Sequence, residues 1–346
     1  MKTFLVTGGA GFLGNHLAHR LLKDGHKVLI LDIAPLEDID LLGRVEFYQG
    51  DVRNFSLMER LAQKADVIIH SAASLPLASN REILSTNILG TKVALEAGLA
   101  AHAKRFINIS STAVYGLSEK HPNVESDPLV EVGAYGKSKI VAENLCEEYR
   151  NKGLIVTIVR PKTFIGVGRL GIFAILFEWV RAGKRIPVIG SGNNRYQLLS
   201  VIDLVDFIVR VSEADPKVAN DTYNIGAREF GTVEEDFGKL FAVAKTGARL
   251  RATPAPLAKF FLRIFEIMGL SPLYKWVYGT ADKDSYVSIE KASRALGWQP
   301  KKSNAQALIE TYEWYCTHWQ EYKHRQGITS REPWKQGILK VVKWLS

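Results

Sequence analysis

Cysteine is scarce in this sequence: Cys146 and Cys316 are the only two among 346 residues. Neither lies at the Cys or His spacing of a metal site, and two thiols do not make a disulfide framework. We therefore expect no metal and no structural disulfide. Two reduced cysteines are typical of the cytosol, so we expect a cytoplasmic protein.

Long apolar runs are also missing. No stretch of 18 apolar residues is present, so we expect no membrane-spanning helix. The apolar segment after Lys2 is broken at once by Thr7-Gly8-Gly9, which argues against a signal peptide.

Long runs of Lys and Arg are absent as well, although the formal net charge is +9. A basic surface attracts anions, but no nucleic-acid-binding motif accompanies the charge. We expect no nucleic-acid partner. A phosphorylated small molecule or an anionic lipid suits this composition better.

What the first half does contain is a regular alternation of strand and helix patterns. Short apolar strands alternating with helices predict a parallel sheet covered on both faces, that is, a Rossmann-type doubly wound α/β fold. The predicted strands are residues 4–6, 27–31, 45–48, 67–69, 105–109 and 155–159, and a helix is predicted at 12–23.

The rhythm changes after about residue 163. Helices are predicted at 172–182, 203–211, 254–268 and 306–318, with a loop at 190–194. We expect a first domain built on this sheet at 1–165. A smaller, mostly helical region should follow at 166–326, with some elements returning to the sheet, and an amphipathic tail at 327–346.

A glycine-rich segment, Thr7 to Gly14, links the first predicted strand to the first predicted helix. Gly8 permits a tight turn, Gly11 lets a pyrophosphate approach the backbone, and Gly14 allows close helix packing. The free N–H groups and the dipole of the helix N-terminus favour the phosphates. The segment predicts a dinucleotide site.

Asp32 ends the second predicted strand. Its carboxylate can accept hydrogen bonds from the adenosine ribose hydroxyls, and it would repel a 2′-phosphate. No Arg or Lys follows within ten residues. We therefore expect NAD(H) rather than NADP(H), with 1–165 as the NAD-binding domain that also carries the catalytic residues and 166–326 as the substrate-binding region.

Tyr135 and Lys139 are four residues apart in a predicted helix and so share one face. An ammonium beside a phenol favours the phenolate, so we expect Lys139 to lower the pKa of Tyr135. Tyr135 could then exchange a proton with an alcohol near neutral pH. The cluster Ser110-Ser111-Thr112 follows the fifth predicted strand and offers a hydroxyl to the reacting oxygen.

Together these motifs resemble the extended short-chain dehydrogenase/reductases, the NAD-dependent epimerase/dehydratase superfamily. The resemblance runs from Met1 to about Tyr315 and implies a NAD-dependent enzyme acting at a secondary alcohol or ketone, with Ser111, Tyr135 and Lys139 as the catalytic residues. Its further motifs are Asp51-Val52, His70-Ser71-Ala72-Ala73, Asn87, Ser111 to Gly116, Arg160-Pro161, Lys291-Ala292 and Leu296-Gly297-Trp298.

The resemblance also implies the cofactor contacts. Asp51 would contact the adenine, Asn87 would support the active site from a neighbouring helix, and Pro161 to Thr163 would lie at the edge of the nicotinamide. The expected cofactor-binding residues are Gly8, Gly11, Phe12, Leu13, Gly14, Asp32, Asp51, Val52, Ala72, Ala73, Asn87, Tyr135, Lys139, Pro161 and Thr163.

Two substrate classes stay open within this superfamily. Arg195 could hold the nucleotide of a nucleotide sugar, although its offset from Asp203 is one residue longer than in typical enzymes of that class. Thr163 stands where many epimerases have Asn, and Lys275 or Lys283 stands where they often have a phosphate-binding Arg. The expected substrate contacts are Ser74, Thr112, Thr163 and Arg195.

The segment 254–272 favours the other class, the 3β-hydroxysteroid-dehydrogenase-like enzymes of sterol, terpenoid or lipid alcohols. It is apolar nearly all round, as a buried helix or one that covers an apolar ligand would be. An ordinary core helix is the alternative. A non-catalytic NAD-binding regulator is a third hypothesis, against which the intact Ser, Tyr and Lys set argues.

The tail predicts a short amphipathic helix at 335–345. Ile338, Val341, Val342 and Leu345 share one arc, and Lys335, Lys340 and Lys343 lie opposite. This pattern is typical of an interfacial membrane anchor, but such a helix could also dock on its own domain or on a dimer partner. The family resemblance implies a homodimer.

Overall fold

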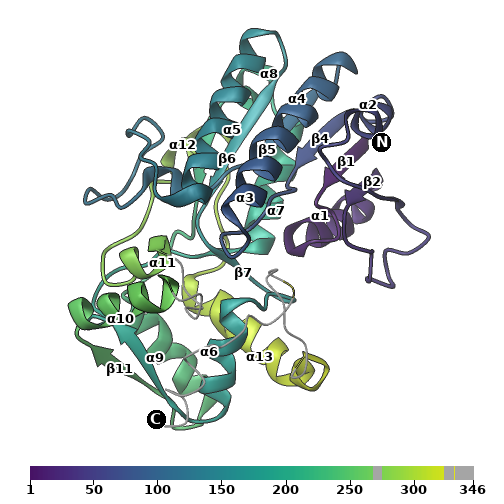
Figure 1. The fold of residues 1–346 in the computed structure, drawn as a ribbon. Coiled ribbons are helices and arrows are strands. Elements are labelled where there is room, and N and C mark those ends of the chain that lie inside the picture. Colours follow the sequence, from purple (N-terminus) through teal and green to yellow (C-terminus); the bar gives the residue numbers. More distant parts are fainter. Residues whose placement is uncertain (268–274, 323–330, 332–346) are drawn as a thin grey trace.

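The computed structural model describes residues 1–267, 275–322 and 331. Its centre is a parallel sheet of seven strands in the order β10-β6-β5-β4-β1-β2-β3, with helices on both faces (Figure 1). The strands are β1 (Thr3–Thr7), β2 (Lys27–Asp32), β3 (Glu46–Gln49), β4 (Val67–His70), β5 (Arg105–Ile109), β6 (Val156–Pro161) and β10 (Thr222–Ile225). The predicted fold class is confirmed, and the six predicted strands are present with ends shifted by at most two residues.

The core lies in two layers because successive residues of a strand point to opposite faces. Phe4 and Val6 of β1 pack into one layer, with α1 (Phe12–Lys23) and α7 (Val201–Glu213). Leu5 packs into the other layer, with α2 (Phe55–Ala62), α4 (Gly90–Ala100) and α5 (Gly133–Asn151). Burial on both faces explains why these strands are continuously apolar.

A second part of the molecule lies below the sheet in Figure 1. Helices α6 (Ile172–Arg181), α9 (Val233–Ala244) and α13 (Asn304–Tyr322) pack around Phe177, whose ring centroid is 5.7 Å from those of Tyr312 and Tyr315. Two short parallel pairs, which the sequence did not predict, complete this part. They are β8 (Arg185–Ile189) with β11 (Arg249–Thr253), and β7 (Phe164–Ile165) with β9 (Leu199–Ser200).

The chain then returns to the sheet. Strand β10 follows α8 (Pro216–Ala219) and pairs with β6, and α12 (Glu290–Leu296) lies against β10. Trp298 comes directly after α12, is fully buried and packs edge-on against Phe207 of α7 at 5.5 Å. Residues late in the sequence therefore complete the core around the seven-stranded sheet.

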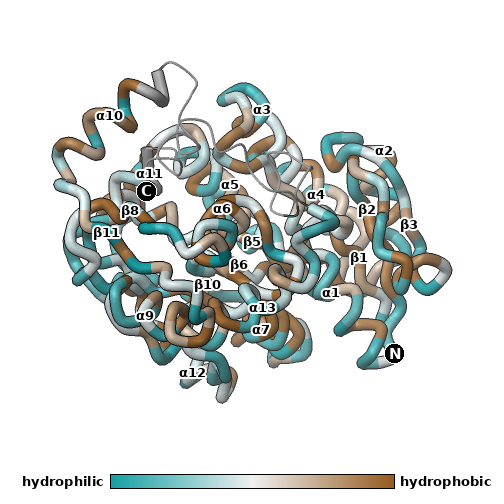
Figure 2. Tube along the Cα trace, turned by 90° about the horizontal axis from the view of Figure 1, so that it is seen from below, coloured by the Kyte–Doolittle hydropathy of each residue, from teal (hydrophilic) through white to brown (hydrophobic). Residues whose placement is uncertain are grey.

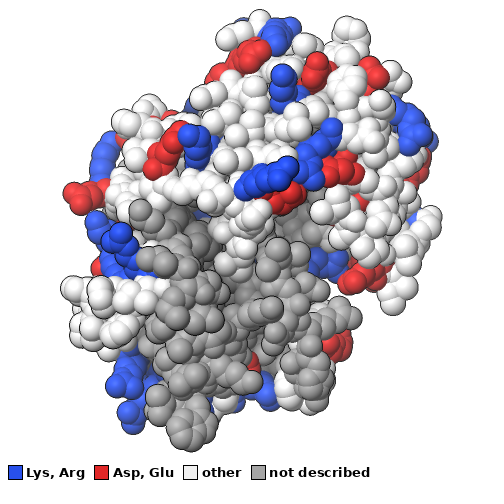
Figure 3. Space-filling model, viewed as in Figure 1, with Lys and Arg blue, Asp and Glu red and all other residues white. Residues whose placement is uncertain are grey.

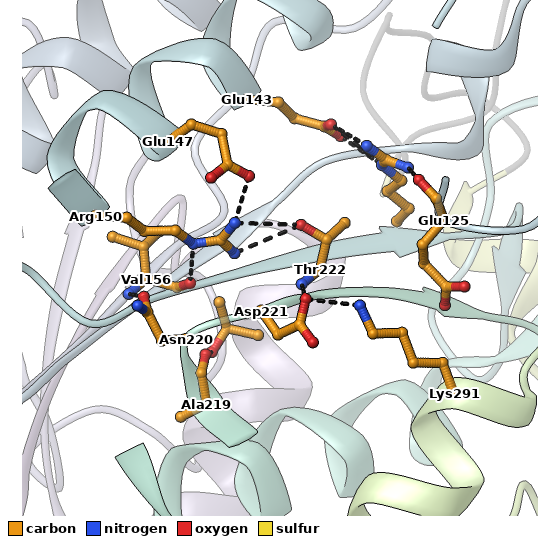
Figure 4. A network of polar contacts seen from close by, with 12 residues as sticks. Glu125, Glu143, Glu147, Arg150, Val156, Ala219, Asn220, Asp221, Thr222 and Lys291 are labelled. Carbon is orange, nitrogen blue, oxygen red and sulfur yellow. Dashed lines mark hydrogen bonds and ion pairs between the residues drawn. The ribbon is translucent and has the colours of Figure 1, made fainter. Parts of the chain in front are cut away.

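Polar contacts fix α5 to this edge of the sheet (Figure 4). Arg150, near the end of α5, donates from Nε to the carbonyl oxygen of Val156 at 2.8 Å and lies beside Thr222 of β10. Lys291 of α12 donates to Asp221, the residue before β10, at 2.6 Å. Helix α5 also carries Tyr135 and Lys139 nearer its start, and the contacts of Arg150 hold its far end at this edge of the sheet.

Helix α10 (Ala255–Ile267) lies at the periphery rather than in the core (Figure 2). Leu257, Phe260 and Phe261 are all exposed, Phe260 to 60%. The alternative of an ordinary core helix for 254–268 is therefore wrong for the side chains that the structure describes. After a gap in the description, α11 (Lys275–Thr280) leads back towards the sheet.

No helix in the described residues is long and apolar enough to cross a membrane. Lys and Arg alternate with Asp and Glu on the upper part of the face in Figure 3, so the positive excess is not gathered there. The predicted amphipathic helix at 335–345 lies outside the described residues.

Candidate active site

The glycine-rich turn joins β1 to α1 at the carboxyl ends of the strands. Gly8 has φ +69°, and a Cβ there would lie 2.8 Å from the backbone of Ala72; a Cβ on Gly14 would lie 2.4 Å from the carbonyl oxygen of Gly8. Neither position tolerates a side chain. Gly11 is the N-cap of α1, without a side chain to cover the helix N-terminus. This cradle fits the pyrophosphate of a dinucleotide.

Asp32 faces this turn from the end of β2. Its carboxylate accepts hydrogen bonds from the backbone N–H groups of Ala10, at 3.0 Å, and Ala34, at 2.9 Å. Burial raises the pKa of Asp32, and these hydrogen bonds oppose the rise. The carboxylate therefore lies beside the turn, where a ribose hydroxyl can reach it.

The other expected cofactor residues lie along the same strand ends. Asp51 forms an ion pair with Arg53 at 2.5 Å, which lowers the pKa of Asp51, and Val52 is buried. Ala72 and Ala73 follow β4, and the backbone N–H of Ala72 donates to Thr7 Oγ1. Phe12 and Leu13 begin α1 and are buried in its core layer.

Asn87 is fully buried in a π-helical turn, Ser85–Leu89, between α3 (Asn80–Leu84) and α4. Its side chain accepts from the Ser74 backbone N–H at 2.7 Å and donates to Ser138 Oγ at 3.0 Å. Asn87 therefore ties the loop after β4 to the turn of α5 between Tyr135 and Lys139. Ser74, an expected substrate contact, is held there through its backbone.

His70 ends β4 and is buried. Its ring nitrogens lie 2.9 Å from Thr7 Oγ1 and 3.0 Å from Thr91 Oγ1. Burial, with a contribution from the charge of Lys139, lowers the pKa of His70 to about 3. His70 therefore stays neutral near pH 7 and serves as a buried hydrogen-bonding side chain between Thr7 and Thr91.

The three expected catalytic residues meet at the carboxyl end of β5. Ser111 caps a 3₁₀ helix, Thr112–Tyr115, and its side chain hydrogen-bonds the phenol of Tyr135. Lys139 Nζ lies 5.9 Å from the ring centroid of Tyr135 and donates to the Ile109 carbonyl oxygen at 2.8 Å. Burial lowers the pKa of Lys139 to about 8.

The expected effect of Lys139 on Tyr135 is not what the structure shows. Burial raises the pKa of Tyr135, because a phenolate loses its hydration, and the hydrogen bond from Ser111 and the charge of Arg169 oppose the rise. The prediction that Lys139 lowers this pKa is therefore wrong, since the ammonium is directed at a carbonyl group. Arg169, which the sequence reasoning missed, is the cation that acts on the phenol.

A buried polar network supports the site from behind. Arg160 of β6 forms an ion pair with Glu143 of α5 at 2.7 Å, and both side chains are at most 7% exposed. Ser110 Oγ also donates to Glu143, and Arg160 donates to the Tyr115 phenol at 2.8 Å. The ion pair raises the pKa of Arg160 against the effect of its burial. The network therefore locks α5 against β6 and the segment that carries Ser111.

A small polar pocket, about 10 Å³ in volume, begins at Thr112, the residue after Ser111. It lies between the segment after Ser111 and residues 280–287, and Lys162 forms part of its wall. The lining residues are Thr112, Tyr115, Gly116, Leu117, Ser118, His121, Asn123, Lys162, Thr280, Lys283, Asp284, Ser285 and Val287. Thr112, an expected substrate contact, is among them.

Comparison with known proteins assigns the family. The profile of the NAD dependent epimerase/dehydratase family matches residues 4–226. The chain belongs to this family. The glycine cradle, Asp32 and the Ser111–Tyr135–Lys139 set are the parts that suit its NAD-dependent chemistry, so the cofactor is NAD.

Relatives of this epimerase/dehydratase family member span nearly its whole length. Uncharacterized protein y4nG of Sinorhizobium fredii is 34% identical over 99% of this chain and 86% of its own. A UDP-glucose 4-epimerase of Mycolicibacterium smegmatis is 28% identical, covering 91% and 98%. The structure of a UDP-glucose 4-epimerase of Thermotoga maritima with UDP-glucose superposes with a TM-score of 0.76 at 26% identity, covering 92% and 99%.

Pro161 and Thr163 flank Lys162 at the end of β6. Pro161 is buried, and Thr163 hydrogen-bonds the phenol of Tyr196. Arg195 does not join the lining of the pocket: its guanidinium carbon lies 4.7 Å from the ring centroid of Phe230 and 5.0 Å from that of Tyr286. Its backbone N–H donates to Asp284, so Arg195 supports the pocket wall; its role towards a substrate stays a prediction.

Two more cations, neither of which the sequence reasoning singled out, contact these sites: Arg331 at the glycine-rich turn and Lys162 in the pocket. Arg331 Nη1 donates to the carbonyl oxygen of Ala10 in the glycine-rich turn at 2.6 Å. Lys162 lies between two residues that the family resemblance did single out. Nothing in the local sequence distinguishes either cation from a surface residue, because their neighbours come from distant segments.

Proposed function

We propose that the chain catalyses hydride transfer at a secondary hydroxyl carbon of a nucleotide sugar, as an epimerase, dehydratase or reductase. The observation that carries the proposal is the hydrogen bond between Ser111 and Tyr135 beside a pocket lined by hydroxyl, amide and charged groups. Two characterised relatives named above are UDP-glucose 4-epimerases. A sugar hydroxyl suits these polar groups better than a sterol does.

The proposed mechanism separates a proton from a hydride. NAD, when bound, supplies the nicotinamide that accepts the hydride from the substrate carbon and can return it. Tyr135, as the phenolate, takes the proton of the substrate hydroxyl, and Ser111 hydrogen-bonds the same oxygen. Lys139 carries its ammonium near neutral pH and holds the end of β5 through its hydrogen bond to the Ile109 carbonyl oxygen. The hydrogen bond from Ser111 and the charge of Arg169 favour the phenolate.

The second part of the molecule, 166–326, would form the substrate side. It supplies Thr280, Lys283 and Ser285 to the pocket, which Thr112 lines from the 3₁₀ helix. The apolar-alcohol alternative relied on the segment 254–272. Helix α10 is exposed, and among the described residues none of its side chains lines the pocket, so it does not support that alternative.

The test is product analysis. The protein is incubated with NAD and, separately, UDP-glucose, UDP-galactose, dTDP-glucose, GDP-mannose and a sterol alcohol, and the products are separated by anion-exchange chromatography. Conversion of at least one nucleotide sugar is expected. Turnover of the sterol alone would replace the proposed function by the alternative, and NAD binding without any turnover would favour a regulator.

Two proposals concern partners. We expect a homodimer, which light scattering after size-exclusion chromatography measures. The tail should bind anionic vesicles weakly, and salt should weaken that binding. Co-sedimentation with anionic liposomes compares the full chain with a variant in which Lys335, Lys340 and Lys343 are replaced by Glu. Equal sedimentation of the two proteins would remove the membrane proposal.

A further inference from the structure

Lys162 is a lysine in an unusual place. It follows the last residue of β6, and its side chain is 2% exposed. Nζ donates to Ser285 Oγ at 2.7 Å and lies 4.9 Å from the ring centroid of Tyr196. Its backbone N–H donates to the carbonyl oxygen of Ile225 at 2.8 Å, so the sheet fixes the position of this residue.

This ammonium has no carboxylate partner among the described residues, where every ion pair of a lysine involves another position. Burial alone lowers the pKa of Lys162, to about 7. A buried cation that is not paired costs stability, and an apolar side chain of similar length would not carry this cost. Packing therefore gives no reason for a lysine here.

The pocket supplies the reason. Lys162 lines it together with Thr112, which directly follows the catalytic Ser111. Further hydrogen-bond donors line the same pocket: Ser118, His121, Thr280, Lys283 and Ser285. Asp284 also lines the pocket, and its carboxylate accepts a hydrogen bond from the backbone N–H of Arg195. Lys283 pairs with Glu119 at 3.5 Å, so Lys162 is the lysine of the lining for which no ion pair is found among the described residues.

We propose that this pocket binds an acidic group of the substrate, a carboxylate or a phosphate, and that Lys162 is the residue that selects for it. The proposal rests on the proposed function, because it takes the pocket beside Ser111 and Tyr135 as the substrate site. An anion entering the pocket pairs with the ammonium of Lys162 and recovers what folding lost by burying it. A neutral substrate would leave the charge uncompensated.

The experiment uses the NAD-loaded protein and three probes that differ in their acidic groups. UDP-glucuronate carries a sugar carboxylate and a pyrophosphate, UDP-glucose lacks the carboxylate, and UDP lacks the sugar. Affinities are measured by calorimetry for the parent, for Lys162→Met and for Lys137→Met. Lys137 is 53% exposed on α5, outside the pocket lining, and serves as the matched control.

We expect Lys162→Met to weaken UDP-glucuronate binding at least tenfold and Lys137→Met to leave it unchanged. If the pocket takes the sugar carboxylate, the affinities for UDP-glucose and UDP stay the same. If it takes a phosphate, all three affinities fall by a similar factor. Unchanged affinity for all three probes in Lys162→Met would overturn the proposal.

Thermal unfolding separates this role from a structural one. A lysine kept for a ligand predicts that Lys162→Met unfolds at the same temperature as the parent or higher. A lower midpoint in both Lys162→Met and Lys162→Gln, which keeps a donor for Ser285, would show that the fold needs this lysine and would overturn the proposal.

A final measurement separates failure of the proposed function from failure of the anion-pocket proposal. If the parent binds none of the three nucleotide probes, the proposed function fails. Inorganic phosphate and D-glucuronate are then tested alone, at constant ionic strength. A rise of the unfolding midpoint in the parent that is lost in Lys162→Met would keep the anion pocket, and no rise in the parent would remove it.

Discussion

Arg160 and Lys162 are buried cations two residues apart at the end of one strand, and their surroundings differ. Arg160 is surrounded by partners: the carboxylate of Glu143, the phenol of Tyr115 and the carbonyl oxygen of Glu125. Lys162 has one hydroxyl and one aromatic face. The pKa of Arg160 is accordingly raised, whereas that of Lys162 is lowered to about 7.

This difference in partners and in pKa shift suggests how structural charges can be told from functional charges in this part of the molecule. A charge that holds elements together is neutralised by the folded chain itself, so its removal should cost stability. A charge that faces the ligand is left uncompensated, so its removal should cost function and can add stability. Lys139 stands between the two kinds: burial lowers its pKa to about 8, the charge of Glu143 opposes that fall, and its ammonium donates to the Ile109 carbonyl oxygen.

The largest effect should come from the reacting end of the cleft. Tyr135→Phe keeps the packing of the ring but removes the proton carrier, so kcat should fall by about 10²- to 10⁴-fold. NAD affinity and the unfolding midpoint should stay close to those of the parent. Steady-state kinetics and thermal unfolding measure both. Full turnover in this variant would mean that another group carries the proton.

The next largest effect should be a loss of stability when Glu143, the carboxylate paired with Arg160, is replaced. Glu143→Gln leaves Arg160 buried without its carboxylate, which typically costs about 3–5 kcal/mol of unfolding free energy. Glu147→Gln on the same helix, 56% exposed and paired with Arg150, should cost less than about 1 kcal/mol. Chemical denaturation compares the two. Equal losses would show that burial does not separate these carboxylates.

Replacing Lys162 should raise the free energy of unfolding, unlike replacing Glu143, and the gain should depend on pH. Its pKa is about 7 in the folded protein and 10.5 ordinarily, so between these values the unfolded chain binds the extra proton. Stability therefore falls as the pH is lowered from 10.5 to about 7, by about 1.4 kcal/mol per pH unit from this group.

Lys162→Met should thus be more stable than the parent at pH 7, and the advantage should shrink towards pH 10.5. His121, Lys283 and Asp284 line the same pocket in both proteins, so the difference between the two denaturation curves reports mainly on Lys162. A constant difference between pH 7 and 10 would show that Lys162 keeps its ordinary pKa.

The smallest effect concerns Asp32, a carboxylate held by backbone N–H groups rather than by a cation. NAD(H) should bind at least tenfold more tightly than NADP(H), which is about 1.4 kcal/mol. Asp32→Asn keeps an acceptor for Ala10 but removes the charge, so the gap should narrow. Calorimetry with both cofactors measures it, and equal affinities in the parent would contradict the role given to Asp32.

The nucleotide half could be predicted closely because its determinants are local. The turn needs glycine at positions 8 and 14 because a Cβ there would clash with nearby backbone atoms. Asp32 can be placed beside the turn because it is the last residue of a strand recognisable from the sequence. Tyr135 and Lys139 are one helical turn apart, so their shared face needs no tertiary information. The sign of the Tyr135 pKa shift was missed, because it depends on burial and on Arg169, and so was the contact of Arg331 with the glycine-rich turn.

The second part of the molecule, residues 166–326, could not be predicted in the same way. Ser285 lies 123 positions after Lys162, and no periodicity connects them. Strands β8 and β11 pair across about sixty residues, and neither is buried enough to give an apolar strand pattern. Helix α10 looked buried from its composition, but hydrophobicity alone does not tell which apolar surface the fold leaves outside.

The return of β10 to the sheet has a consequence for modularity. The nucleotide-binding half ends at no single point in the chain, since its edge strand and the tryptophan that seals its core come after residue 220. A fragment ending at residue 165 would expose the flank of β6 and lack the side chains that fill one core layer. Exchanging substrate specificity between relatives by swapping a contiguous segment would carry part of the nucleotide fold along with it. Grafting single pocket residues leaves the shared sheet intact.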